Sequence, residues 1–171
     1  GSGETIEPSN MSKYAPLHKI KNWRRLLSNN YSVPFTLDER SWNSVEHYVI
    51  AQHYKATSPE FYNEFSLQSK SDLGKRLSKD VELALKTLSM RTYKSEEIRP
   101  DYVAIDTSIT KEHLNTERER AMHAKFTQNE DAKQALLLTN DATLMKYIVR
   151  KPAQEDVSLM RLRNELLPPS I

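Results

Sequence analysis

The stretch Trp42-Asn43-Ser44-Val45-Glu46-His47-Tyr48 joins the two kinds of secondary structure that the sequence predicts. Before it, residues 31–37 are β-branched and aromatic, which indicates a short strand. Residues 38–40 form a plausible turn, although it lacks glycine, and residues 41–42 then begin the returning strand of a hairpin. After it, Asn43 or Ser44 caps a helix that we expect to run to about residue 57, because such side chains satisfy the first N–H groups of a helix.

Helical patterns dominate the rest of the chain, with apolar residues near helical spacing or proline at a first turn. Helices are expected over residues 17–27, 59–67, 71–90 (one helical stretch or two), 111–128 and 156–167. Asn129 or Asn140 can cap short helices that follow the fourth of these, and residues 135–138 supply core. A further strand is expected at residues 102–105. The patterns predict a compact single domain of the α+β class, mainly α-helical, with a short antiparallel strand pair near residues 31–42.

Composition narrows the classes of function. The 171 residues include no cysteine, which excludes disulfides, thiolate nucleophiles and cysteine–zinc sites and suits the cytosol or nucleus. Three glycines cannot build a GxGxxG or Walker phosphate loop. His113 and His123 lack the spacing of metal ligands, so neither a metal nor a cofactor is expected. No apolar run approaches the roughly 20 residues of a membrane span, and no membrane partner is expected.

Charge is nearly balanced, with a formal net charge of +2, which argues against a dedicated nucleic-acid binder. A local basic run is nevertheless present, formed by Lys19, Lys21, Arg24 and Arg25. Such a run is most often a solvated helix face, but it can also bind phosphates of a nucleotide or of nucleic acid. Residues 1–16 are polar and aperiodic, so we expect a flexible arm or linker there, before a domain that spans residues 17–171.

Three blocks of sequence resemble the NADAR family. The first contains Leu27-Ser28-Asn29, Pro34-Phe35-Thr36-Leu37-Asp38 and the stretch 42–48, where the family reads L/F-S-N-F, P-F-x-L-D-G and W-x-S-V-E-H-Y. The second, residues 124–129, is similar to A-K-F-x-Q-N, and residues 136–139 follow it as L-L-x-T. The third, residues 159–163, is similar to the terminal L-M-x-x-R helix. The resemblance covers roughly residues 17–167.

A narrower resemblance points to the branch found in eukaryotes and large DNA viruses. Residues 19–29 match its K-I-K-x-W-R-x-x-L-S-N motif, and residues 58–62 and 98–100 are similar to N-P-E-F-Y and I-R-P. Gly1-Ser2-Gly3 is either a cloning remnant or native sequence of that branch. In the second case the chain is part of a larger parent protein or assembly. The expected location is intracellular, in the cytoplasm or nucleus, or in a viral factory or virion.

The resemblance implies an N-glycosidase that acts on ADP-ribosyl or phosphoribosyl ligands. Cleavage of a ribose N-glycosidic bond builds positive charge on the sugar, which a nearby carboxylate stabilises. Glu46 is the candidate carboxylate, and His53 shares its helix face seven residues later, where the family usually has lysine. Histidine forms no stable imine with a sugar aldehyde, but it can act as a general acid or base.

The resemblance also implies residues that hold the ligand, each with an ordinary structural alternative. Asn29 would bond the ribose or base, or it is a turn residue. Trp42 would stack on a nucleobase, or it belongs to the hairpin core. Lys125 and Asn129 would contact the ligand, or they serve structural pairing and helix capping. Arg24 or Arg25 would bind its phosphates.

Several positions depart from the family pattern, and they favour a second hypothesis. Asn30 and Glu39 replace a phenylalanine and a glycine of the family motifs, and His53 replaces the lysine. The low glycine count points the same way, because close approach of backbone to phosphate often needs glycine. The alternative is therefore a catalytically inactive NADAR-like domain, kept for ligand binding or as a structural and interaction module of a larger protein.

Overall fold

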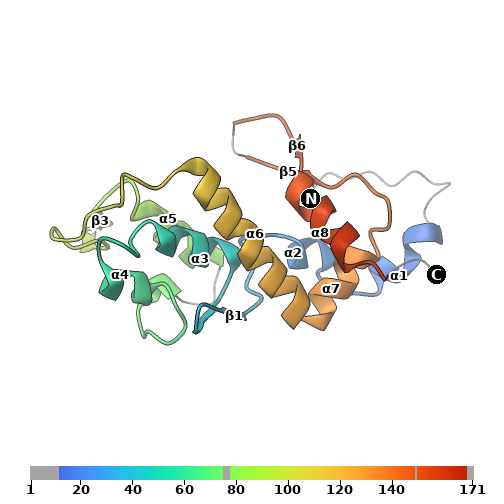
Figure 1. Cartoon of the computed structure of the whole chain (residues 1–171), viewed down its shortest axis with the longest axis horizontal. Coiled ribbons are helices and arrows are strands. Elements are labelled where there is room, and N and C mark those ends of the chain that lie inside the picture. Colours follow the sequence, from blue (N-terminus) through green and yellow to red (C-terminus); the bar gives the residue numbers. More distant parts are fainter. Residues whose placement is uncertain (1–11, 75–77, 149, 169–171) are drawn as a thin grey trace. The chain divides into compact units, whose positions relative to one another are not determined.

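The computed structural model describes residues 12–74, 78–148 and 150–168 (Figure 1). The chain divides into two compact units. One is Asn29–Gln128, and the other combines Gly1–Ser28 with Asn129–Ile171. Its architecture is α+β with helices predominating, as the sequence predicts. Most of the predicted N-terminal arm lies outside the described residues, so its boundary at residue 16 stays a prediction.

The predicted hairpin opens the unit Asn29–Gln128. Strand β1 (Phe35–Leu37) pairs antiparallel with β2 (Arg40–Trp42), which confirms the strand pair, although its first strand begins at residue 35 and not at residue 31. Asp38 and Glu39 make the two-residue turn, and both have positive φ, 52° and 65°. Positive φ at both central residues is the requirement of a type I′ turn, whose twist matches that of the strands.

The left-handed backbone conformation of Glu39 destabilises the protein, so Glu39→Gly is expected to stabilise it by about 1 kcal/mol. A left-handed conformation costs a side-chain-bearing residue roughly 1–2 kcal/mol, from which glycine's extra freedom in the unfolded chain is subtracted. Urea denaturation of the two proteins measures the difference. Asp38→Gly serves as the contrast, because that variant also loses the carboxylate contacts described below and should be destabilised. A loss of stability in Glu39→Gly would contradict the argument.

Helix α3 (Val45–Gln52) is the centre of this unit. Ser44 is its N-cap, and the Ser44 Oγ accepts a hydrogen bond from the backbone N–H of His47 at 3.2 Å. Apart from Glu46, every residue of α3 is buried. The helix ends five residues before the predicted position because the N–H groups of His53 and Tyr54 bond to carbonyls three residues back, at 3.1 and 3.0 Å, and begin a series of turns.

The other helices of this unit are α4 (Pro59–Glu64), the 3₁₀ turn η2 (Asp72–Gly74), α5 (Ser78–Lys86) and α6 (Lys111–Gln128). Pro59 begins α4 and α6 has the predicted ends. Helix α6 packs along α3. The predicted strand at residues 102–105 is wrong, because that segment is a loop with no partner strand. The sequence reading missed a hairpin, β3 (Thr92–Tyr93) with β4 (Glu96–Glu97).

The second unit contains α1 (Ala15–His18), α2 (Trp23–Leu26), α7 (Glu130–Leu137), β5 (Met145–Lys146), β6 (Gln154–Glu155) and α8 (Val157–Leu166). The predicted helix at residues 17–27 is interrupted, because Asn22 adopts a left-handed conformation with φ of 61°. Asn140 does not cap a following helix and instead lies after α7, again left-handed. The last helix is confirmed, and Asp156 caps it by accepting the N–H of Leu159 at 3.2 Å.

Within the described ranges, no helix combines the length and the apolar character that crossing a membrane requires.

Candidate functional site

Glu46, the candidate catalytic carboxylate, is bound by an arginine. It lies in the first turn of α3, and its backbone N–H donates to the carbonyl of Asn29 at 3.1 Å. The Arg118 side chain, from α6, donates through Nε to Glu46 Oε1 at 2.7 Å and through Nη2 to Oε2 at 3.4 Å. The two side chains are 20% and 32% exposed, so the pair is partly shielded from solvent. Arg118 therefore fixes the position of the Glu46 carboxylate and compensates its negative charge.

His53, the second candidate, is the C-cap of α3 and is half-buried. Burial lowers the pKa of its imidazole, and the positive charge of Arg118 lowers it further, against smaller opposing effects of Asp106 and Glu46. The ring is therefore mainly neutral near pH 7 and able to accept a proton. The backbone N–H of Asp106 donates to the His53 carbonyl at 2.8 Å, which attaches the loop before α6 to the end of α3.

That loop bounds a hollow of about 560 Å³, which we call the Asp106 hollow. It is lined by Gln52, Lys55, Ala56, Asp106, Ser108, Ile109, Thr110 and His113. The loop is held in place by its own side chains. Ser108 donates to Asp106 Oδ1 through its backbone N–H at 2.9 Å and through its hydroxyl at 2.6 Å, and Thr110 Oγ1 accepts the N–H of His113 at 3.0 Å.

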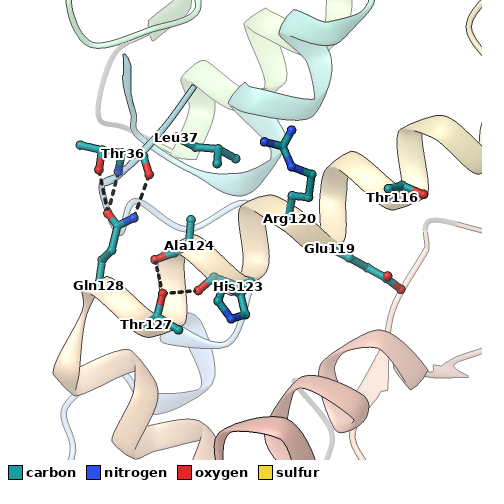
Figure 2. A pocket seen from close by; sticks show the side chains of 9 residues that line it. All are labelled: Thr36, Leu37, Thr116, Glu119, Arg120, His123, Ala124, Thr127 and Gln128. Atoms are coloured by element: carbon teal, nitrogen blue, oxygen red, sulfur yellow. Dashed lines mark hydrogen bonds between the residues drawn. The ribbon is translucent and has the colours of Figure 1, made fainter. Parts of the chain in front are cut away.

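A second hollow, of about 500 Å³, lies between β1 and α6 (Figure 2). Gln128 lines this hollow. Its side-chain amide forms hydrogen bonds with the backbone of Thr36, in the way that the backbone of a neighbouring strand would. Gln128 Nε2 donates to the Thr36 carbonyl at 2.8 Å, and the Thr36 N–H donates to Gln128 Oε1 at 2.7 Å (Figure 2). The glutamine of the residues 124–129 block therefore has a structural role, since it satisfies the edge of β1.

Four side chains, Asp38, Tyr48, Glu117 and Arg120, form what we call the Tyr48 network. The Tyr48 hydroxyl lies 2.6 Å from Asp38 Oδ2 and 2.5 Å from Glu117 Oε2. Arg120 donates to Asp38 Oδ1 at 2.9 Å and to Glu117 Oε2 at 2.8 Å. Burial and the two carboxylates raise the pKa of Tyr48, which keeps the phenol protonated. The network ties the hairpin turn to α3 and α6.

Two further predicted site residues are deeply buried. Trp42 is fully enclosed, its Nε1 donates to the Leu37 carbonyl at 3.0 Å, and its ring meets the edges of Tyr48 and Tyr62. Stacking on a nucleobase would require an exposed ring face, which this conformation does not offer. Lys125 is also fully enclosed, and burial lowers its pKa to about 7.

The remaining predicted residues fall in different places. Asn29 is partly buried, and among the described residues its Oδ1 finds no hydrogen-bond partner. Arg24, Arg25 and Asn129 belong to the other unit. The Arg24 guanidinium lies over the Trp23 ring at 4.1 Å, Arg25 is exposed, and Asn129 occupies the N-cap position of α7.

The sequence reading missed Arg118, Lys55 and Asp106, and it considered His113 only as a metal ligand. Arg118 precedes Lys125 by seven residues in a predicted helix, so a common face could have been inferred, but not the carboxylate that this face meets. Over the described residues, histidine and carboxylate side chains do not gather in groups of three that could hold a metal ion.

The fold is similar to that of a solved structure, the NMR structure of the Escherichia coli protein YbiA. The likeness has a TM-score of 0.54 at 22% sequence identity, and it covers 82% of this chain and 77% of YbiA. YbiA is a NADAR protein, so the NADAR resemblance extends to the fold. No family model matches the chain, and neither does any of the curated proteins with which it was compared.

Proposed function

We propose that the chain is a NADAR-type domain that binds an ADP-ribosyl or phosphoribosyl N-glycoside and cleaves it far more slowly than a competent glycosidase. The observation that carries the proposal is the ion pair of Glu46 with Arg118. The fold likeness and the position of Glu46 on α3 support the choice of ligand class. The engagement of its carboxylate by arginine supports slow cleavage.

The physical argument concerns the charge that forms during cleavage. As the base departs, the ribose becomes positively charged, and a free carboxylate beside the anomeric carbon would stabilise it. Arg118 already satisfies both oxygens of Glu46, so the sugar has to compete with a guanidinium for that carboxylate. His53, being mainly neutral, can orient water or accept a proton, but it supplies no amine for an imine with a ring-opened sugar.

Arg118→Gln is expected to speed cleavage about tenfold or more, since a change of 1.4 kcal/mol in the barrier corresponds to a factor of ten. Release of ADP-ribose from DNA modified on guanine would be followed for wild type, Arg118→Gln and the double variant with Glu46→Gln. We expect slow release by wild type, faster release by the single variant and none by the double variant. Wild-type release as fast as that of an active family enzyme, measured in parallel, would overturn the proposal.

Binding is measured separately, by thermal unfolding with ADP-ribose. A ligand that binds only the folded protein stabilises it by about 2.7 kcal/mol at a hundredfold excess over Kd. We expect stabilisation of wild type and of Glu46→Gln, because binding does not need the cleavage step. Absence of any shift with ADP-ribose or with ribose 5-phosphate would reject the ligand-binding role and leave a structural module.

Nucleic acid that carries such a modified base is the proposed macromolecular partner. Support comes from exposed basic side chains in the unit that contains residues 12–28, namely Lys19, Lys21 and Arg25. Phosphate contacts of this kind position a nucleic acid without reading its sequence.

A further inference from the structure

We propose that the Asp106 hollow is a phosphate subsite, with Lys55 and His113 as its cationic and donor groups. The inference rests on the proposed function in one respect, namely that the phosphate belongs to the ribosyl ligand. The volume of about 560 Å³ is in the range of pockets that hold small ligands. It has room for a phosphate or pyrophosphate together with part of a sugar.

Lys55 and His113 are the basic residues in the wall, and the ends of their side chains have capacity for an anion. Their side chains are 54% and 53% exposed. Each is only loosely paired, with Lys55 Nζ 4.0 Å from Asp38 and His113 Nε2 3.9 Å from Glu117. By contrast, the nearby arginines Arg118 and Arg120 are held by carboxylates at 2.7–2.9 Å. A phosphate can therefore recruit Lys55 and His113 without breaking a close ion pair.

The rest of the wall suits a phosphorylated sugar. The Thr110 hydroxyl accepts the His113 N–H, which leaves its own proton to donate to a phosphate oxygen. Asp106 would repel phosphate, but its carboxylate is an acceptor for sugar hydroxyls, and Ser108 holds one of its oxygens in place. Ile109 and Ala56 add apolar surface. The wall thus offers donor groups for the phosphate end of a ribose phosphate and an acceptor, Asp106, for the hydroxyls of its sugar end.

The hollow also adjoins the candidate catalytic residues. The Asp106 N–H bonds to the carbonyl of His53, the residue on the Glu46 face of α3. A ligand anchored by phosphate at Lys55 and His113 would extend its sugar past Asp106 in the direction of His53.

The test compares ligands with and without phosphate in calorimetric titrations of the full chain. The variants are Lys55→Met, His113→Ala and the two combined, and Lys70→Met is the matched control, because Lys70 is exposed and lies in neither hollow. We expect the combined variant to lose at least about tenfold in affinity for ADP-ribose and to leave adenosine binding unchanged. Lys70→Met should bind both as wild type does.

A titration with sodium pyrophosphate, followed by NMR, separates this inference from the proposed function. Shifts at Lys55 and His113 support the subsite even if wild type fails to bind ADP-ribose, in which case only the proposed function falls. Unchanged ADP-ribose affinity in the combined variant, or pyrophosphate shifts confined to other residues, would overturn the subsite while the proposed function stands. An NMR spectrum of each variant shows whether it is folded. If the combined variant fails to fold, the single variants and the pyrophosphate titration of wild type provide the test.

Discussion

Lys125→Met is expected to raise the free energy of unfolding by about 4 kcal/mol at pH 7, because the pKa falls from 10.5 to about 7 and each unit corresponds to about 1.4 kcal/mol, while half of the folded protein is already neutral at that pH. The Lys125 ammonium is fully enclosed, and burial lowers its pKa from 10.5 to about 7. Folding is therefore unfavourable for the ammonium form of Lys125, which is the form that the unfolded chain holds at pH 7. Methionine has a similar unbranched shape, so the space stays filled. The cost of burying charge disappears, together with the contacts of the ammonium, which include the one over the Phe126 ring at 4.8 Å.

The pH dependence gives an independent signature of Lys125. Between about pH 7 and pH 10.5 the unfolded chain holds this proton while the folded protein has released it. Because the unfolded state binds more protons, stability rises with pH across that window. Below pH 7 both states are charged, and the full cost of burial applies. The part of this increase in stability that is due to Lys125 should be absent in Lys125→Met.

Urea denaturation at several pH values measures both effects. Lys111→Met is the control, because Lys111 is an exposed residue of the same helix and its loss should change stability by no more than about 0.5 kcal/mol. A destabilised Lys125→Met would show that the interactions of the Lys125 Nζ outweigh its burial. In that event the same variant would be titrated with ADP-ribose, since a contact with the ligand is the other role expected of Lys125.

The sequence predicts elements well where their signals are local. The ends of α6 follow from one long periodic stretch, and the start of α8 follows from the cap Asp156. The break at Asn22 is not visible in the apolar pattern. The apolar spacing continues through it, and a single left-handed residue redirects α2, which packs on α7. The wrong strand at residues 102–105 has a non-local cause, because a strand needs a partner backbone that no local pattern reveals.

The candidate site could be predicted only in part. Glu46 follows from one motif, and its position as the one residue of α3 that is not buried fits a site at this face. Its partner Arg118 is 72 residues away, so the ion pair depends on how α3 and α6 pack. The two hollows also arise from packing. The wall of the Asp106 hollow joins the end of α3 to the loop before α6, and no local pattern predicts that these two segments meet.

Arg120→Met is expected to destabilise the protein by about 2–3 kcal/mol, somewhat below the 3–5 kcal/mol typical when one partner of a fully buried ion pair is removed. Arg120 donates to both carboxylates of the Tyr48 network, Asp38 and Glu117. Those carboxylates are only 24% and 11% exposed and share one phenolic proton from Tyr48. Without the guanidinium, their mutual repulsion is no longer offset.

Acid titration tests the same interaction through Asp38. Burial opposes its ionisation, but hydrogen bonds from Arg120 and Tyr48 prevail and lower its pKa below 3.8. A carboxyl with a lowered folded pKa contributes stability that is fully present above its unfolded pKa and is lost as the pH falls through the folded value. The contribution of Asp38 to stability should therefore fade below about pH 4 in wild type. In Arg120→Met this contribution is already reduced, so the acid-induced loss should be smaller.

Arg118→Met is the matched comparison, because Arg118 lies on the same helix but pairs with a single carboxylate, Glu46. We expect it to cost about 1 kcal/mol, the upper part of the range for partly exposed ion pairs. Thermal and urea unfolding of both variants, at pH 7 and at pH 3, give the two differences. Equal losses at pH 7 would show that the second carboxylate adds nothing. An unchanged acid profile in Arg120→Met would show that Tyr48, and not Arg120, lowers the pKa of Asp38.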